Sequence, residues 1–218
     1  YDKNLIASQI SSQEASPQIT LLTIVNSTNT HLKSNLYAND LLSICIAEKQ
    51  TEGRGRRGKI WYSPFGSSIT FSIRKKLMID PQISGCLSLI TGLSLISALH
   101  KLGNSGLKIK WPNDIYFNHK KLAGILIETV AIKQGYVDFI IGIGINLDIP
   151  DSCSSNIDQP WINLSEIGNS CNQNRSIIVA TIVNELILNL KIFQEEGLKP
   201  FMSDWSTHDY LYGHLIRV

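Results

Sequence analysis

The hydrophobic pattern of the chain predicts a succession of strands and helices. Runs rich in β-branched and apolar residues predict strands, which cover 19–25, 42–48, 67–74, 107–111, 115–117, 122–132 and 136–147. Apolar residues that recur every three or four positions predict helices, which cover 29–38, 82–102, 162–168, 175–196 and 199–205. The stretch from Gln82 to Leu99 carries no charged residue, which predicts that its helix is buried.

The order of these elements favours one fold class. Strands and helices do not alternate strictly, and 115–117 and 122–132 are predicted to be hairpin arms around residues 118–120. This pattern predicts an α+β fold, with a mixed, largely antiparallel sheet and helices on one face, rather than a doubly wound fold. Residues 1–17 are weakly patterned and are expected to form a short helix or an arm.

Composition and charge limit the function classes. The chain has 218 residues, 43% of them hydrophobic, which is enough for one large domain with a real core. Its net charge is +2, so no global field attracts nucleic acid or a membrane surface. We find no apolar run that we expect to span a membrane and no signal peptide at the N-terminus.

The cysteines indicate neither a metal site nor a disulfide framework. Cys45, Cys86, Cys153 and Cys171 form no C-x-x-C pair, and no histidine stands at a metal-ligand spacing from them. Cys45 and Cys86 lie in apolar segments and are expected to be inert buried thiols. A reducing cytoplasm is the expected location.

Basic residues and glycines concentrate in one segment, Gly53 to Lys59, which we call the basic loop. It contains three glycines and three of the chain's six arginines, at positions 54, 56 and 57. Arginines provide forked donors for carboxylate and phosphate. The glycines match G-x-G-x-x-G, but a strand follows instead of the helix that a dinucleotide fingerprint requires, and the chain has no Walker A motif. Alone, the basic loop is typical of a solvated surface loop or of one that touches nucleic acid.

Further motifs follow in a fixed order. Lys110-Trp111-Pro112-Asn113-Asp114 precedes Lys121-Leu122-Ala123-Gly124-Ile125, and Gly142-Ile143-Gly144-Ile145-Asn146 ends the last long strand. Near the start, Ser27-Thr28-Asn29 reads as a helix cap. Gly142 and Gly144 indicate close approach of either a ligand or a helix.

With the basic loop, this series resembles the biotin protein ligases, whose signatures are G-R-G-R-x-G, K-W-P-N-D, K-x-x-G-I and G-x-G-x-N. The resemblance runs from about Ile24 to Trp205. It implies the mixed sheet shared with lipoate ligases and class II aminoacyl-tRNA synthetases. It also implies an ATP-dependent ligase that forms biotinyl-5′-AMP and transfers biotin to a lysine of biotin carboxyl carrier protein, a subunit of acetyl-CoA carboxylase.

The resemblance implies roles for individual residues. The residues expected to be catalytic are Arg56, Lys121 and Asp114. Those expected to bind biotin are Ser27, Thr28, Asn29, Gln50, Gly53, Arg54, Arg56, Lys121, Gly124 and Ile125. Those expected on the ATP side are Arg57, Lys59, Trp61, Asn113, Asp114 and Asn146. Asp114 is expected either to help bind Mg²⁺ or to accept a proton from the incoming amine, and by itself it would be read as a turn residue.

The resemblance also implies partners and domains. Residues 1–206 are expected to form the catalytic domain, and 207–218 to begin a β-barrel-like C-terminal domain. Few residues precede the first strand, so no helix-turn-helix domain and no specific DNA binding are expected. Relatives pair through sheet edges, and the strands within 122–147 permit such a homodimer.

Three other functions compete with this interpretation. One is a lipoate or octanoate ligase of the same fold, and another is a biotin-binding protein with impaired transfer. A nucleic-acid module that uses the arginines of the basic loop would show steep salt dependence. A single basic loop on a nearly neutral chain disfavours this third function.

Overall fold

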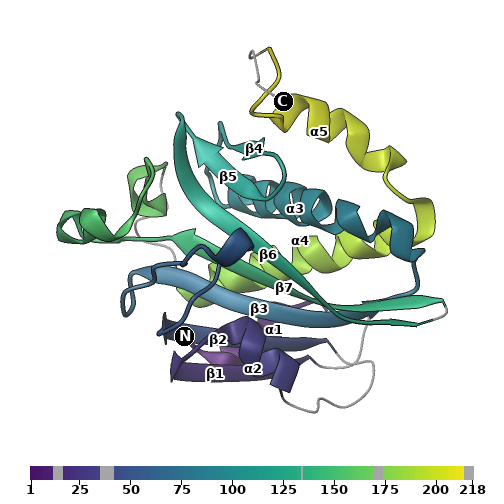
Figure 1. The fold of residues 1–218 in the computed structure, drawn as a ribbon, viewed down its shortest axis with the longest axis horizontal. Helices are drawn as coiled ribbons and strands as arrows, with labels where there is room; N and C mark the ends of the chain where they lie inside the picture. The colour runs from purple at the N-terminus through teal and green to yellow at the C-terminus, as the bar shows by residue number, and fades with distance from the viewer. Residues whose placement is uncertain (12–16, 35–41, 134, 169–173, 214–218) are drawn as a thin grey trace.

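One seven-stranded sheet organises the structure, a computed structural model that describes residues 1–11, 17–34, 42–133, 135–168 and 174–213. The strand order is β1-β2-β3-β7-β6-β5-β4 (Figure 1). β1 (Gln18–Val25) is parallel to β2 (Ser43–Gln50), and every other neighbouring pair is antiparallel. The predicted mixed, largely antiparallel sheet is therefore confirmed.

The longest strands form the centre of the sheet. β3 (Ser68–Leu77) pairs with β7 (Tyr136–Asn146), which pairs in turn with β6 (Lys120–Lys133). The far edge consists of the short strands β5 (Asp114–Phe117) and β4 (Lys108–Lys110). Each of these strands was predicted from the sequence to within a few residues.

The two faces of the central strands differ in character because side chains alternate across a strand. On one face, odd-numbered residues such as Phe71, Ile125 and Ile143 join the main hydrophobic core. On the other face, even-numbered residues such as Ser72, Gly124 and Gly144 are small or polar. One face is thus committed to packing, whereas the other can receive a ligand.

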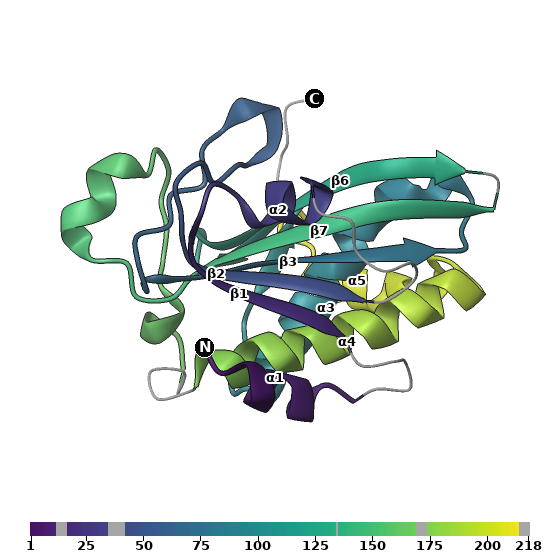
Figure 2. The ribbon, with the colours of Figure 1, turned by 90° about the horizontal axis from the view of Figure 1, so that it is seen from below.

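Three helices cover the apolar face. α1 (Lys3–Gln9), α3 (Leu87–Lys101) and α4 (Arg175–Glu196) lie on this side of the sheet (Figure 2). Asp80 accepts a hydrogen bond from the Gln82 backbone and caps the 3-10 turn η2 (Pro81–Cys86) that leads into α3. The predicted helix over 82–102 therefore begins as a 3-10 turn.

One helix lies on the opposite face, so the expectation of helices on one face holds only for the core layer. α2 (Thr28–Ser34) packs against β2, β3 and β7 on the side away from α3 and α4 (Figure 2). Its buried Leu32 joins Cys45 and Ile140 in a second, small apolar cluster. The predicted helix over 29–38 is confirmed as far as Ser34, and its remainder falls outside the described residues.

The remaining elements are short. η3 (Asp151–Asn156) and η4 (Leu164–Glu166) follow β7, and η6 (Lys199–Phe201) leads into α5 (Met202–His208). Asn163 and Glu166 form a reciprocal capping box at η4. Residues 207–218 were expected to begin a further domain. Of these, 207 and 208 belong to α5, 210–213 form bends and turns, and 214–218 lie outside the described part of the chain.

Two apolar helical stretches correct the expectation about membrane spans. Pro81–Lys101 and Arg175–Glu196 are both long and apolar enough to cross a membrane by length and composition alone. In the fold they pack against each other and the sheet, and Glu185 of α4 accepts hydrogen bonds from Ser97 and Lys101 of α3. The core of a soluble domain produces the same pattern, so these helices are weak evidence for a membrane.

The cysteine predictions are met in part. Cys45 is fully buried, and burial raises the pKa of its thiol to about 12, so it stays protonated at neutral pH. Cys86 and Cys153 are half-buried free thiols, so the prediction that Cys86 is buried was wrong. Cys171 lies outside the described residues.

A buried ion pair holds α2 on the sheet. Arg74 of β3 forms two hydrogen bonds to Asp138 of β7, at 2.9 and 3.2 Å, and a third to the Leu32 carbonyl in the last turn of α2, at 3.1 Å. The side chain of Asp138 is 5% exposed and that of Arg74 is 22% exposed. Removing one partner leaves the other charge poorly compensated.

We therefore expect Asp138→Ala to lower the free energy of unfolding by about 2 to 3 kcal/mol, because Arg74 can regain only part of its hydration. Chemical denaturation followed by circular dichroism measures this loss. Glu195→Ala, which removes an exposed carboxylate from α4, is the control and should change stability by less than about 0.5 kcal/mol. Equal effects of the two substitutions would contradict a stabilising role for the Arg74–Asp138 pair.

Candidate active site

The basic loop folds as a short hairpin rather than as the start of a helix. Trp61 N donates to Gly53 O at 2.8 Å, and Gly55 N donates to Lys59 O at 2.7 Å. A 3-10 turn, η1 (Arg56–Gly58), forms the tip, where Arg57 and Gly58 have φ of 55° and 76°. A side chain at Gly53 would collide with the Trp61 carbonyl oxygen. Glycine is therefore required at position 53 for close approach and favoured at 58 for a positive φ.

Trp61 lies on a floor of two glycines. Gly124 of β6 and Gly144 of β7 are paired in register. A Cβ atom at Gly144 would lie 2.6 Å from Trp61 Nε1, and one at Gly124 would lie 3.0 Å from Trp61 Cζ3. Trp61 Nε1 is itself buried and has no hydrogen-bond partner. The glycines let the indole approach the sheet closely, and the indole N–H has no protein acceptor among the described residues.

Gly142 has a different neighbour. A Cβ atom there would overlap the Asn29 side-chain oxygen and lie 3.0 Å from Asn29 Cγ. Asn29 belongs to α2, so the close approach indicated at Gly142 is that of a helix residue, whereas at Gly144 it is that of Trp61. Together these three glycines shape a cavity between the basic loop, α2 and the sheet.

This cavity of ≈ 390 Å³ brings together almost all the predicted site residues. Those that line it are Ser27, Thr28, Asn29, Gln50, Arg54, Arg56, Arg57, Lys59, Trp61, Asn113, Asp114, Lys121, Gly124 and Ile125. Gly53 and Asn146 are not among the lining residues. Segments far apart in the sequence therefore converge on one site.

Asn146 instead holds the loop after β7 in place. Its side chain is 4% exposed, and its amide donates to the carbonyls of Lys121 and Ile162 at 3.1 and 3.3 Å. The backbone N of Lys121 donates to the carbonyl of Pro160, and the carbonyl of Lys121 accepts from the backbone N of Ile162. Asn146 thus fixes the backbone of Lys121, and its predicted role toward the nucleotide stays a prediction.

One end of the cavity is cationic, and two of its cations already contact neighbouring side chains. Lys121 Nζ is 2.8 Å from Asp114 Oδ1, so the two side chains form an ion pair. Arg56 Nη1 donates to Asn113 Oδ1 at 3.3 Å. Two hydrogen bonds to Ile125 hold Asn113 in turn. The side-chain Nδ2 of Asn113 donates to the Ile125 carbonyl, and the Ile125 backbone N donates to the Asn113 carbonyl, both at 2.9 Å.

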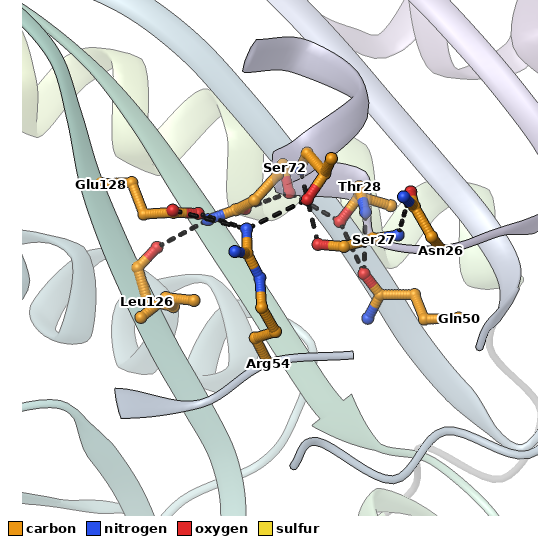
Figure 3. A network of polar contacts seen from close by, with 10 residues as sticks. Asn26, Ser27, Thr28, Gln50, Arg54, Ser72, Leu126 and Glu128 are labelled. Carbon is orange, nitrogen blue, oxygen red and sulfur yellow. Dashed lines mark hydrogen bonds and ion pairs between the residues drawn. The ribbon is translucent and has the colours of Figure 1, made fainter. Parts of the chain in front are cut away.

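The other end is polar and nearly neutral, and Figure 3 shows its contacts. Gln50 Oε1 accepts from the backbone N and hydroxyl of Thr28 at 2.8 and 3.1 Å. Ser72 Oγ lies 2.6 Å from Thr28 Oγ1 and 2.5 Å from Asn29 Oδ1. Ser27 also caps α2 weakly, at 3.5 Å from Thr30 N. This end can recognise a neutral polar ring.

The lysine of the K-W-P-N-D motif is not a cavity residue. Lys110 Nζ lies 4.8 Å from the ring centre of Tyr116 and 5.8 Å from that of Tyr210. Burial raises the pKa of Tyr116, so its hydroxyl stays neutral at physiological pH. Lys110 therefore lies against two aromatic rings that contact each other, and the motif reaches the cavity through Asn113 and Asp114.

Sequence reasoning missed several site residues. Glu128 contacts Asn29 and Arg54, Asp158 lies 3.7 Å from Lys59, and Ser72 joins the polar end. Glu128 could have been found, because it is a charged residue in an apolar strand and lies on the same face as Gly124. Asp158 and Ser72 gave no such signal, since exposed aspartates and strand serines are common.

The site suits alignment of anions rather than covalent catalysis. Its lining contains arginine, lysine and amide groups, but no serine–histidine or cysteine–histidine pair. Within the described ranges, no group of three or more His, Cys, Asp or Glu side chains is placed to hold a metal ion. Electrostatic stabilisation and positioning are the chemistry that such residues can supply.

Comparisons with known proteins agree with this geometry. Residues 21–146 match the model of the biotin/lipoate A/B protein ligase family. The bifunctional ligase/repressor BirA of Escherichia coli is 37% identical over 214 residues, which are 98% of this chain and 66% of that protein. The biotin–[acetyl-CoA-carboxylase] ligase of Mycobacterium tuberculosis is 30% identical over 182 residues, which are 80% of this chain and 64% of that protein.

A solved structure extends the likeness to three dimensions. The biotin protein ligase of Aquifex aeolicus, in complex with biotin and ATP, aligns with a TM-score of 0.71 and 30% identity, covering 88% of this chain and 78% of that one. The chain spans 66% and 63% of the length of the BirA proteins of Escherichia coli and Salmonella typhimurium. Because the family model covers more than half of the chain, and an E. coli relative aligns along nearly all of it, the chain belongs to the biotin/lipoate A/B protein ligase family.

Proposed function

We propose that this chain activates biotin with ATP to biotinyl-5′-AMP and transfers the biotin to a lysine of biotin carboxyl carrier protein. The observation that carries the proposal is a single cavity with a neutral polar end, a glycine floor and a cationic end. Biotin has a neutral polar ring at one end and a carboxylate at the other, so it matches this polarity. The names of the relatives and the biotin and ATP bound in the A. aeolicus structure support the same substrates.

In the first step, a biotin carboxylate oxygen attacks the α-phosphorus of ATP, and pyrophosphate leaves. Both reactants are anions, so the protein must bring them together and compensate their charge. Lys121 and Arg56 lie at the cationic end of the cavity and would perform this task. They exchange their present partners, Asp114 and Asn113, for oxygens of the ligand. No protein nucleophile is needed.

In the second step, an acceptor lysine amine attacks the acyl carbon of the adenylate. A C–N bond forms, the acyl C–O bond to phosphate breaks, AMP leaves, and the amine loses a proton. Asp114 is a candidate acceptor for that proton, as expected from the sequence. Until the acceptor arrives, the basic loop keeps water from the anhydride. Arg57 and Lys59 near the tip of the loop are assigned to the triphosphate, and Trp61 to the border with adenine.

Asp114 also fits a role toward Mg²⁺. Mg²⁺ that accompanies ATP takes only one or two protein carboxylates, because phosphate oxygens and water supply its other ligands. The Asp114 carboxylate lines the cavity at its cationic end, beside Lys121. When bound, the metal would reduce the negative charge of the phosphates. Asp114 is the residue that would hold it.

The partners follow from this reaction. The acceptor is the biotin carboxyl carrier protein subunit of acetyl-CoA carboxylase, and the location is the cytoplasm, where ATP is available. Homodimerisation is proposed through β6, because β5 pairs with it only as far as Gly124 and the later part of that edge has no strand partner in the described chain. Residues 1–206 are assigned to the catalytic domain.

The first prediction tests adenylate formation. Protein incubated with biotin, ATP and Mg²⁺ should release pyrophosphate and form biotinyl-AMP, and an added acceptor domain should become biotinylated. Lys121→Ala should abolish the adenylate, because the lysine charge that faces the acyl phosphate is lost, while the protein stays folded. Biotin binding without adenylate in the wild-type protein would favour a binding protein. Wild-type turnover by Lys121→Ala would remove Lys121 from the mechanism.

The second prediction concerns the loop tip. Arg56→Gly removes the contact to Asn113 and a cation near the acyl phosphate, so the adenylate should dissociate about tenfold or more faster. The free adenylate should then label lysines of an added bystander protein such as albumin. Lys33→Gln, an exposed substitution on α2, is the control. Unchanged adenylate retention in Arg56→Gly would contradict the proposed role of the loop.

The third prediction separates biotin from lipoate. Lipoate and octanoate lack biotin's polar ring, and the Thr28–Gln50–Ser72 end would be left without a partner if either occupied the cavity. Neither compound should inhibit pyrophosphate release at a tenfold excess over biotin. Effective competition by lipoate, with lipoyl transfer to an acceptor domain, would replace the biotin assignment by lipoate ligation.

A further inference from the structure

Glu128 connects the two walls of the cavity, although no sequence motif points to it. It lies on β6, on the same face as Gly124, and its side chain is 21% exposed. Its Oε2 accepts from Asn29 Nδ2 at 2.7 Å, and its carboxylate accepts from Arg54 Nη2 at 3.1 and 3.4 Å. The same Arg54 nitrogen donates to Thr30 Oγ1 at 3.0 Å. These contacts appear together in Figure 3.

The two partners of Glu128 belong to different parts of the site. Asn29 is part of the polar end, where it lies on Gly142 and contacts Ser72. Arg54 is in the first arm of the basic loop, opposite Ile60. One carboxylate therefore fixes the position of the loop relative to the polar end of the cavity. All the described contacts of Arg54 use Nη2, so the donors on Nε and Nη1 remain for a ligand.

We infer that Glu128 is a positioning residue that latches the basic loop, through Arg54 and with Thr30, over the biotin and adenylate cavity. The inference rests on the proposed function for its ligand, but the latch itself is a property of the ligand-free protein. Hydrogen bonds between charged partners are about twice as strong as neutral ones. The Glu128 contact should therefore hold the loop more firmly than the Thr30 contact does.

An alternative is that Glu128 merely competes with the ligand for Arg54. Removing its charge would then free Arg54, and biotin and the adenylate would bind more tightly. A second alternative is that Glu128 only orients Asn29. Its loss would then alter the apparent biotin affinity without changing the motion of the loop. The latch predicts weaker retention of the adenylate after loss of the Glu128 charge, which is opposite to the first alternative. It also predicts a more mobile loop, which the second alternative does not.

Limited trypsin digestion of the ligand-free protein tests the latch without any activity. Arg56 and Arg57 are exposed trypsin sites at the loop tip, and cleavage there requires the 3-10 turn to unfold locally, so its rate reports how firmly the loop is held. Glu128→Gln keeps an acceptor for Asn29 but removes the charge facing Arg54, so cleavage should be about tenfold faster. Thr30→Val removes only the neutral contact, and cleavage should be about threefold faster. Glu195→Gln, an exposed substitution on α4, should cleave like the wild type.

Adenylate retention provides the second measurement. Preformed biotinyl-AMP, chased with excess unlabelled biotin and ATP, should dissociate about tenfold faster from Glu128→Gln, while the single-turnover rate of adenylation at saturating biotin falls less than about twofold. In an Arg54→Gln background, Glu128→Gln should add less than about twofold, because its partner is already gone. Thermal unfolding of each variant verifies that the fold is intact.

The outcomes separate the two claims. If the wild type forms no adenylate, the proposed function fails, and the trypsin result still decides whether the latch exists. If the wild type is active but Glu128→Gln is cleaved no faster than the wild type, the latch is refuted. Slower adenylate release from Glu128→Gln would establish the competing-acceptor alternative instead. Fully additive effects of Arg54→Gln and Glu128→Gln would also overturn the inference.

Discussion

The site depends on glycines that keep one face of the central sheet free of side chains. Gly124 and Gly144 form a pair across β6 and β7, and Gly142 lies two residues before Gly144 on the same face. Any Cβ at these positions would occupy the space of Trp61 or Asn29. Because the opposite face packs against α3 and α4, the sheet cannot shift away to make room. The glycines therefore determine how deep the cavity is.

Charge compensation is the second feature that shapes the site. Arg54, Lys59 and Lys121 each lie within ion-pair distance of a carboxylate, from Glu128, Asp158 and Asp114 respectively. A cluster of unpaired cations would repel itself in the ligand-free protein and would attract any anion. Paired cations instead release their partners only for a ligand that offers better contacts.

Most of the fold could be predicted from local patterns, because strand positions follow from β-branched runs. Fourteen of the residues that the family resemblance implied line the cavity. Local pattern alone indicated only a helix cap at residues 27–29 and a solvated basic loop. What could not be predicted depends on long-range contacts. The partner of Arg54 is 74 positions away on β6, and the sequence gives no measure of that proximity. Likewise, Asn146 lies in a motif but faces backbone carbonyls.

The position of the short helix α2 on the sheet also could not be predicted, because it depends on long-range contacts. Its sequence suggested only a capped helix, and the side of the sheet on which it packs follows from Arg74, Asp138 and the small cluster around Leu32. That placement brings Thr28 and Asn29 to the cavity. A helix of this length has too few apolar residues for their periodicity to show which side of it packs on the sheet.

The hairpin form of the basic loop explains how one latch can control the whole cavity. Trp61 N is bonded to Gly53 O at the base of the hairpin, and Trp61 lies on the glycine floor. Arg54 is adjacent to that base, so the latch acts next to the point from which the loop would swing. If the hairpin moves as a unit, release of Arg54 from Glu128 uncovers the tip and shifts the indole from Gly124 and Gly144. Access to the floor and exclusion of water from the cavity are then two consequences of the same contact.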